Sequence, residues 1–231
     1  MPVNEYGQMI GESMEGYTPG TLPSIDFLEG RYARIEALSV DKHAEDLLAV
    51  YGPDTPQEMW TYLFQEPVVD MEELVTLLNQ MLARKDRFYY AIIDKETGKA
   101  LGTFSLMRID QNNRIIEVGA VTFSPDLKGI RTGTEAQYIL VRYVFEELNY
   151  RRYEWKCDAF NLPSRRAAAR LGFVYEGTFR QAVIYKGRTR DTDWLSMIDK
   201  DWAQVKSRLE TWLCPENFDQ NGRQYKSLRE L

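Results

Sequence analysis

The sequence contains few of the side chains that define common catalytic and metal-binding centres. Its 231 residues include one histidine, His43, and two cysteines, Cys157 and Cys214. Two cysteines cannot supply four zinc ligands or a disulfide framework, and we expect no metal site. A Ser–His or Cys–His centre would depend on His43. Because no G-x-S-x-G motif accompanies it, we assign His43 no catalytic role.

Long apolar runs and an excess of positive charge are also missing. No apolar run approaches the roughly 18 residues that can span a membrane, and the N-terminal stretch lacks the basic and apolar regions of a signal peptide. The net charge of −6 gives no basic footprint for nucleic acid. The P-loop and the G-x-G-x-x-G fingerprint are absent. We therefore expect a cytoplasmic protein without nucleic-acid or membrane partners.

The patterns that are present predict a mixed α/β domain with one mostly antiparallel sheet. Hydrophobic residues make up 44% of the chain, enough for a real core. After a first strand near 31–38 and a helix with Asp41 as its N-cap, three strand-like runs follow across short polar turns, which predicts a meander. Helices and strands then alternate, with a long helix from Thr132 to Leu148 and a short helix that Gly172 ends.

Two further segments receive a structural interpretation. In "YRRYEWKCDA" the alternation places Tyr153, Trp155 and Cys157 on one face, so we expect Cys157 to be a core thiol. In "KGRTRDTDW", residues 186–194, the dense charges are typical of a solvated turn with salt bridges. We divide the chain into an N-terminal arm (1–28), a main α/β domain (29–201) and a C-terminal helix with a polar tail (202–231).

The stretch "SPDLKGIRTGTEAQYILV" joins a buried strand to a helix through a basic, glycine-bearing loop. The first turn of a helix has four unpaired N–H groups and roughly half a positive charge, so a strand, a glycine turn and a helix start can hold a phosphate. The alternative is a plain connection whose basic residues face water. The stretch alone leaves both interpretations open.

The pattern N-x-x-S-x-x-A-A-x-x-L-G-F-x-x-E-G runs from Asn161 to Gly177. Together with the strand, loop and helix before it, this pattern resembles the GNAT family of acyl-CoA-dependent N-acyltransferases over about residues 29–201. The likeness is closest to the branch of ribosomal-protein N-terminal acetyltransferases. One departure is that Arg131 stands where the family's loop usually has its central glycine. Because Arg131 has a Cβ and cannot freely adopt a positive φ, we expect a reshaped turn in which its guanidinium contacts phosphate.

The resemblance implies a sheet that splays between its fourth and fifth strands, with acetyl-CoA as cosubstrate in the gap. It assigns contact with the pantetheine arm to Val121, Thr122 and Phe123 of the fourth strand. It also implies that Gly119 and Ala120 keep the surface near the thioester small. Ordinary strand core is the alternative for all five.

The resemblance assigns the coenzyme's diphosphate to a continuous segment of loop and helix start. Its residues are Lys128, Gly129, Ile130, Arg131, Thr132, Gly133 and Thr134.

The chemistry implied is direct attack of a neutral amine on a thioester. At pH 7, deprotonating a lysine-type amine costs roughly 4–5 kcal/mol and an α-amine about 1 kcal/mol, so one carboxylate could suffice for an α-amine. Glu117, alone in the apolar run 115–121, is the candidate base, and burial should raise its pKa. The alternative is a structural ion pair with Arg108 or Arg114.

Five further residues complete the expected site. Ser164 matches the family position that often faces the CoA sulfur, and Asn161 one that often binds pantetheine; the alternative is that Asn161 is a helix N-cap. Tyr175 is a second candidate acid. Trp60 and Tyr62 are candidates for the acceptor wall, with aromatic packing as the alternative.

We therefore expect an N-acetyltransferase that moves an acetyl group from acetyl-CoA to a primary amine in a ternary complex. A protein N-terminus, an amino acid or peptide, a polyamine or an aminated antibiotic could be the acceptor. A non-catalytic CoA-binding module is the alternative function, and a homodimer is left open.

Overall fold

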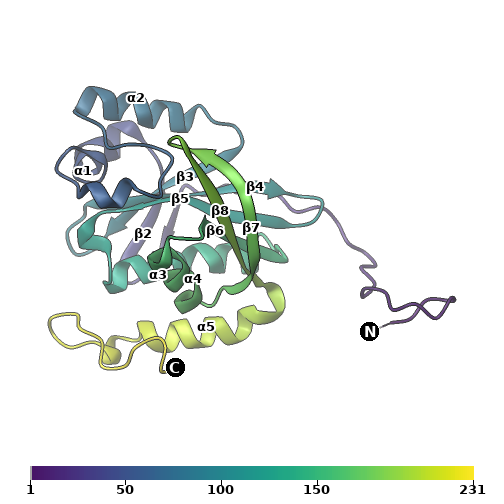
Figure 1. Cartoon of the computed structure of the whole chain (residues 1–231). Helices are drawn as coiled ribbons and strands as arrows, with labels where there is room; N and C mark the ends of the chain where they lie inside the picture. The colour runs from purple at the N-terminus through teal and green to yellow at the C-terminus, as the bar shows by residue number, and fades with distance from the viewer. Residues whose placement is uncertain (1) are drawn as a thin grey trace.

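The computed structural model describes residues 2–231, and its centre is one eight-stranded sheet (Figure 1). The strand order is β1-β2-β3-β4-β5-β6-β8-β7. The strands are β1 Phe27–Glu29, β2 Ala33–Ala37, β3 Arg87–Asp94, β4 Ala100–Asp110, β5 Ile115–Phe123, β6 Arg152–Asp158, β7 Val174–Tyr185 and β8 Arg188–Ile198. The short β1 precedes the first expected strand, so the expected fourth and fifth strands are β5 and β6.

Helices cover both faces of this sheet (Figure 1). The α-helices are α1 Val40–Tyr51, α2 Met71–Leu82, α3 Arg131–Arg142, α4 Leu162–Leu171 and α5 Asp199–Leu213. Helices α1 and α2 lie on one face, and α3 and α5 lie on the other with α4 beside them. Within residues 2–231, no helix is both long enough and apolar enough to cross a membrane.

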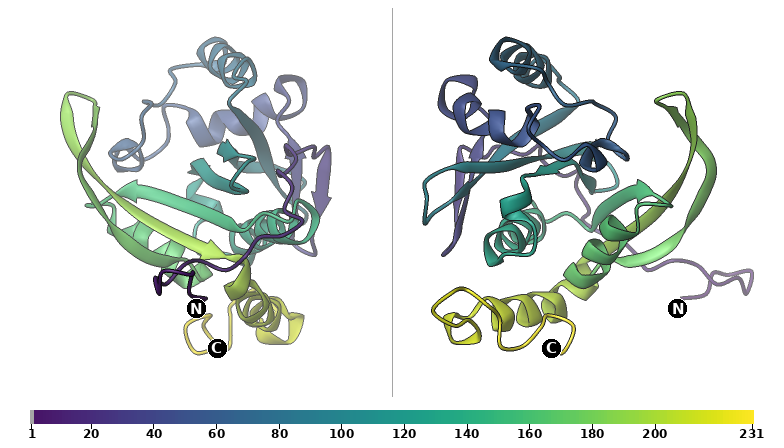
Figure 2. Two further views of the ribbon diagram at one scale, coloured as in Figure 1. Left: turned by 90° about the vertical axis from the view of Figure 1, so that its right-hand side faces the viewer. Right: turned by 60° about the vertical axis from the view of Figure 1, so that its left-hand side comes forward.

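The expected meander is confirmed, because β2, β3, β4 and β5 pair antiparallel in sequence order. The pair of β5 with β6 is parallel, and α3 forms the connection between the two strands. Beyond β6, the hairpin of β7 and β8 curves toward the side of the sheet that carries α1 and α2 (Figure 2). The expected α/β fold, with a mostly antiparallel sheet flanked by helices, is therefore the fold observed.

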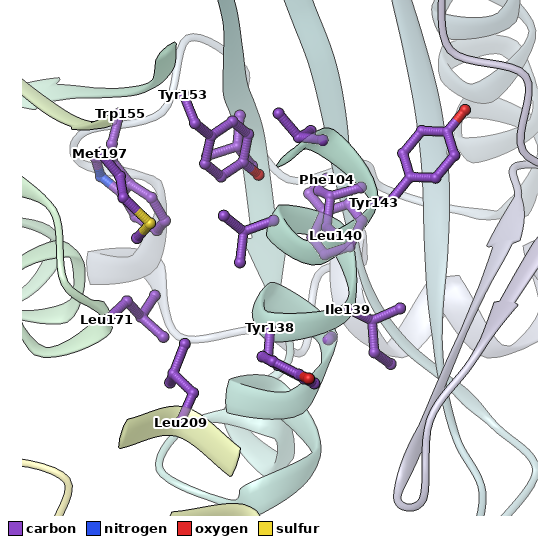
Figure 3. Packing of buried hydrophobic residues seen from close by; sticks show 14 of the residues in the cluster. Phe104, Tyr138, Ile139, Leu140, Tyr143, Tyr153, Trp155, Leu171, Met197 and Leu209 are labelled. Carbon is purple, nitrogen blue, oxygen red and sulfur yellow. The ribbon is translucent and has the colours of Figure 1, made fainter. Parts of the chain in front are cut away.

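The larger core lies between the sheet and the layer formed by α3, α4 and α5. Tyr138 and Leu140 of α3 pack there with Tyr153 and Trp155 of β6 and with Leu209 of α5 (Figure 3). Cys157 is 5% exposed and belongs to the same cluster, as its place in the strand pattern predicted. A second, smaller cluster fills the space under α1 and α2 on the opposite face.

Three local expectations differ from the structure. The N-cap of α1 is Ser39 and not Asp41, and the Ser39 N–H donates to Nδ1 of the buried His43 at 3.1 Å. The long helix expected to reach Leu148 becomes a π-helical turn over Tyr143–Glu147. The segment 186–194 is not one solvated turn, because only Lys186 and Gly187 turn, both with positive φ as in a type I′ hairpin, and β8 begins at Arg188.

Glu135 ties the start of the sheet to α3. Its buried carboxylate accepts hydrogen bonds from the backbone N–H groups of Arg31, Tyr32 and Ala33, at 3.0, 2.5 and 2.6 Å. Gly30 makes this approach feasible, because a Cβ there would stand 2.6 Å from the Glu135 carboxylate. The turn between β1 and β2 is thus held by a carboxylate one helical turn into α3.

We predict that Glu135→Gln lowers the free energy of unfolding by about 2–3 kcal/mol, because an amide group then faces three N–H donors that now share a carboxylate. Urea denaturation measures the loss. The matched control is Glu147→Gln, an exposed carboxylate at the end of the π-helical turn, which should change stability by less than about 0.5 kcal/mol. Equal losses in both variants would contradict the role given to Glu135.

Candidate active site

The sheet opens between β5 and β6. The two strands pair from Ile115 with Arg152 to Val118 with Trp155, and no pairing between them continues beyond that point in the residues described. In residues 119–123, the backbone N–H and C=O groups that face β6 therefore have no strand partner. An open strand edge of this kind can pair with an extended ligand through main-chain hydrogen bonds.

A β-bulge reinforces the opening. Ser105 of β4 pairs with Gly119, and Thr103 pairs with Thr122, so β5 has one more residue than β4 in this interval. The extra residue is accommodated at Ala120, which has a φ of 49°. Bulges of this type bend a strand and increase its twist, which accounts for the divergence of β5 from β6.

Side chains around the bulge differ in their surroundings. Thr122 is buried, while Val121 and Phe123 are half-buried and pack against the larger core. At Gly119 a Cβ would stand 2.5 Å from Sδ of Met107, so a side chain at this position would displace Met107. Pantetheine contact by residues 121–123 stays a prediction, which the unpaired backbone at this place supports.

The N-terminus of α3 lies directly after the open part of β5. Its N-cap residue, Ile130, offers no side-chain acceptor, whereas α2 and α4 are capped by Asp70 and Asn161. The first N–H groups of α3 therefore lack an intrahelical or capping partner. Uncapped amides and the helix dipole together fit an anionic group such as a diphosphate.

The loop before α3 makes its turn without a glycine at position 131. Gly129 takes the positive φ, 79°, and Arg131 is already the first residue of the helix. Lys128, Gly129 and Ile130 are exposed. Gly133 is buried, and a Cβ there would stand 2.8 Å from the Leu127 carbonyl oxygen, so its small size lets the loop pack against α3.

The Arg131 side chain is held by aromatic rings. Its guanidinium carbon lies 4.2 Å from the ring centre of Tyr32 and 5.5 Å from that of Phe218 in the C-terminal tail. Thr132 is buried, and Thr134 accepts a hydrogen bond from Arg170 at 2.6 Å. Contact of these side chains with phosphate stays a prediction, and the backbone N–H groups are the donors that the geometry leaves open.

Glu117 lies at the point where the strands part, on the sheet face that carries α1 and α2. It is 4% exposed, and its Oε2 accepts a hydrogen bond from Lys156 Nζ at 2.6 Å. Nε of Arg108 lies 3.4 Å from the same oxygen, while Arg114 instead contacts Thr18 and the Asn149 carbonyl. Of the two ion-pair partners left open by the sequence, Arg108 is therefore the one in contact.

Burial raises the pKa of Glu117 above its ordinary value, and the positive charges of Lys156 and Arg108 offset only part of this effect. Oε1 has no hydrogen-bond partner among the residues of the described chain. Glu117 thus combines a raised pKa with one free acceptor oxygen, which are the properties of a general base.

Lys156 is the residue at this site that the sequence did not single out. Its side chain is 7% exposed, it also bonds Glu154 at 2.8 Å, and its Nζ lies 3.7 Å from the ring centre of Trp194. Arg152 continues the row by pairing with Glu154 at 2.7 Å and with Glu176. The alternation that buries the other face of β6 puts Lys156 on the same face as Glu117. The strand pattern could therefore have predicted on which face Lys156 lies, but not its contact with Glu117.

Ser164 lies next to the opening, in the first turn of α4. Its Oγ accepts a hydrogen bond from Trp155 Nε1 at 3.0 Å, and its own O–H remains able to donate. Asn161 caps α4 by accepting from the Ser164 N–H at 3.1 Å. The N-cap role proposed for Asn161 is therefore observed, and its contact with pantetheine stays a prediction.

The remaining candidates are placed less centrally. The hydroxyl of Tyr175 bonds Thr178 Oγ1 at 2.7 Å, and Thr178 in turn donates to the buried Asp193. Trp60 is 1% exposed and packs in the smaller core with its indole N–H on Thr55, whereas Tyr62 is half-buried. Their roles as acid and acceptor wall stay predictions. No group of three or more potential metal ligands occurs within residues 2–231.

The splayed sheet, the uncapped helix start beside it and the buried carboxylate match the arrangement expected of an acyl-CoA-dependent N-acyltransferase. A family model described as an acetyltransferase (GNAT) domain matches residues 34–174. The chain belongs to the GNAT family, whose members use acetyl-CoA.

One solved structure shares the fold over most of the chain, and two curated proteins are similar in sequence. A GCN5-related N-acetyltransferase from Brucella melitensis is 42% identical, with a TM-score of 0.91 over 94% of this chain and 98% of that one. An uncharacterized N-acetyltransferase p20 from Bacillus licheniformis is 28% identical over 74% of this chain and 96% of its own. A putative ribosomal N-acetyltransferase YdaF from Bacillus subtilis is 31% identical over 47% of this chain and 59% of its own.

We predict that Lys156→Met lowers the free energy of unfolding by about 3–5 kcal/mol at about pH 8, because two buried carboxylates lose their shared cation. The pKa of Glu117 then rises further above its unfolded value. The native state holds a proton that the unfolded state releases, so the loss becomes smaller as pH falls.

Urea unfolding at about pH 5 and about pH 8 measures this difference. Lys206→Met is the control, because Lys206 is partly exposed, pairs with Glu146, and should cost about 1 kcal/mol or less at either pH. An equal loss at both pH values for Lys156→Met would contradict the coupling to Glu117.

Proposed function

We propose that this protein transfers the acetyl group of acetyl-CoA to a primary amine by direct attack in a ternary complex. The observation that carries the proposal is Glu117, a buried carboxylate with one free oxygen at the point where β5 and β6 part. When bound, acetyl-CoA supplies an acetyl thioester. The backbone of 119–123 and the N–H groups that open α3 are the groups we expect to hold it.

In the proposed reaction Glu117 accepts the proton of the attacking amine, directly or through one water. An α-amine has a pKa near 8 and loses its proton at a cost of about 1 kcal/mol at pH 7, so a single carboxylate is adequate. Lys156 and Arg108 hold the Glu117 carboxylate through Oε2 and leave Oε1 for this task. The cations therefore position the base while its burial keeps the pKa high.

Ser164 is the residue we propose as proton donor to the departing thiolate. Trp155, whose indole N–H donates to Ser164 Oγ, belongs to the last residue pair before the strands separate. Tyr175 is less suited, because its hydroxyl already bonds Thr178. The proposed acid and base thus lie on opposite faces of the sheet, each beside one of the residue pairs that precede its opening.

We predict that Glu117→Gln retains the thermal shift caused by acetyl-CoA and loses thiol release by about 10²–10⁴-fold on amine acceptors, because only the base is removed. A ligand at 100 times its Kd stabilises the folded state by about 2.7 kcal/mol, which a thermal shift detects readily. In the unsubstituted protein, kcat/KM should rise with pH through a pKa above the ordinary glutamate value.

Glu154→Gln is the matched control for this variant, because Glu154 is a second buried carboxylate on the same lysine. We expect it to keep its rate within about tenfold. Normal turnover by Glu117→Gln would rule out Glu117 as the base. A thermal shift without any thiol release from the unsubstituted protein would favour the alternative of a CoA-binding module.

A further inference from the structure

Arg190 is a buried cation that lacks a carboxylate partner. It is 7% exposed, and its Nε donates to Thr192 Oγ1 at 3.1 Å. No carboxylate oxygen of residues 2–231 lies within 4.0 Å of its guanidinium, whereas Arg152 and Arg165 each have one. A guanidinium has five N–H donors, and a buried charge without a partner is costly, so the unused donors of Arg190 indicate a binding role.

Strand register places Arg190 on the same face as the candidate base. Asp158 of β6 pairs with Thr192, and Lys156 pairs with Trp194. Because side chains alternate along β8, Arg190, Thr192 and Trp194 share the face on which Lys156 contacts Glu117. Four residues of β8 separate Arg190 from Trp194, which corresponds to roughly 13 Å along the strand.

Two aromatic rings lie beside the Arg190 guanidinium. Its guanidinium carbon lies 5.4 Å from the ring centre of Phe64 and 5.7 Å from that of Tyr185. The two rings contact each other, and Lys186 ties the hairpin to the carbonyl of Trp60. Apart from Nε–H, the guanidinium N–H groups have no hydrogen-bond partner among residues 2–231, and in-plane guanidinium N–H groups match the geometry of a carboxylate.

We propose that Arg190 binds a carboxylate of the amine acceptor, and that the acceptor is a short peptide with a free α-amine. This inference rests on the proposed acetyl transfer. With the amine at Glu117 and the carboxylate at Arg190, the ligand must be extended over roughly 10–13 Å, the reach of about three to four residues. A peptide of this size carries one C-terminal negative charge, and the Arg190 guanidinium has no carboxylate partner among residues 2–231 to compete with it.

Two other acceptor classes fit less well. A polyamine would bring positive charge against Arg190, and like charges at close range are unfavourable. A phosphate would bring up to two negative charges beside the buried carboxylate of Asp158, whose oxygens already accept from Tyr185 and from the Phe160 N–H. One arginine balances a carboxylate and leaves no excess charge.

The test compares trialanine with trialanine amide, which differ only in the terminal carboxylate, and includes spermidine as a polycation. We expect kcat/KM for trialanine to exceed that for the amide by at least about tenfold. Arg190→Gln should lower kcat/KM for trialanine by about 10–100-fold, leave the amide within about twofold, and keep the thermal shift with acetyl-CoA.

Arg188→Gln is the matched control. Arg188 lies on the same strand, is exposed, stacks on the same Tyr185 and bonds the Thr61 carbonyl, so its loss removes a link between the hairpin and the 57–61 segment without removing Arg190. We expect this variant to keep the preference for trialanine. An equal loss on both peptides in Arg190→Gln would show that Arg190 only holds the aromatic rings together, and would overturn the inference.

The outcomes separate this inference from the proposed function. Equal rates on trialanine and its amide, or a preference for spermidine, would overturn the carboxylate site while upholding acetyl transfer. If no amine were acetylated, the proposed acetyl transfer would be wrong. Calorimetry on the CoA-saturated protein would then still test whether Arg190 binds a carboxylate. Tighter binding of trialanine than of its amide would support it, and equal binding would overturn it.

Discussion

The parting of β5 and β6 after the pair Val118–Trp155 is the constraint on which the rest of the molecule depends. Two parallel strands normally continue side by side until one ends, and here a single extra residue at Ala120 turns β5 away. The unpaired edge that results is costly in a protein interior unless another partner completes it. In this fold the same divergence exposes a strand edge and directs the chain into α3 beside it.

The second consequence of the parting is electrostatic. Where the strands still pair, the residues on the face that carries α1 and α2 form a largely buried row of alternating charge. The row runs through Glu117, Lys156, Glu154 and Arg152. Each member is satisfied by its neighbours, so the row tolerates burial that isolated charges would not. Glu117 is the end member at the opening, and one of its oxygens lies outside the network. Position in the row therefore distinguishes Glu117, the carboxylate that we propose as the base, from Glu154.

Much of the fold could be predicted from the sequence, because it depends on local patterns. The meander, the buried face of β6 and the glycine end of α4 all follow from alternation or from conformational preference, and Gly172 has the expected left-handed φ of 110°. The loop before α3 was harder, since position 131 looked like a glycine site. The structure shows that the helix begins one residue earlier and that Gly129 carries the unusual φ. A helix start that moves by one residue cannot be predicted from the residue types in the loop.

Residues whose meaning depends on distant partners could not be predicted in the same way. Lys156 and Glu117 are 39 positions apart, and only the parallel pairing of their strands joins them. Arg190 lies among nine residues so rich in charge that a solvated turn was the natural interpretation. What buries it is Phe64, which arrives from a segment more than a hundred residues earlier and covers the hairpin only in the folded chain. A charged sequence near a turn therefore says little about exposure when an aromatic ring from a distant segment can cover one of its side chains.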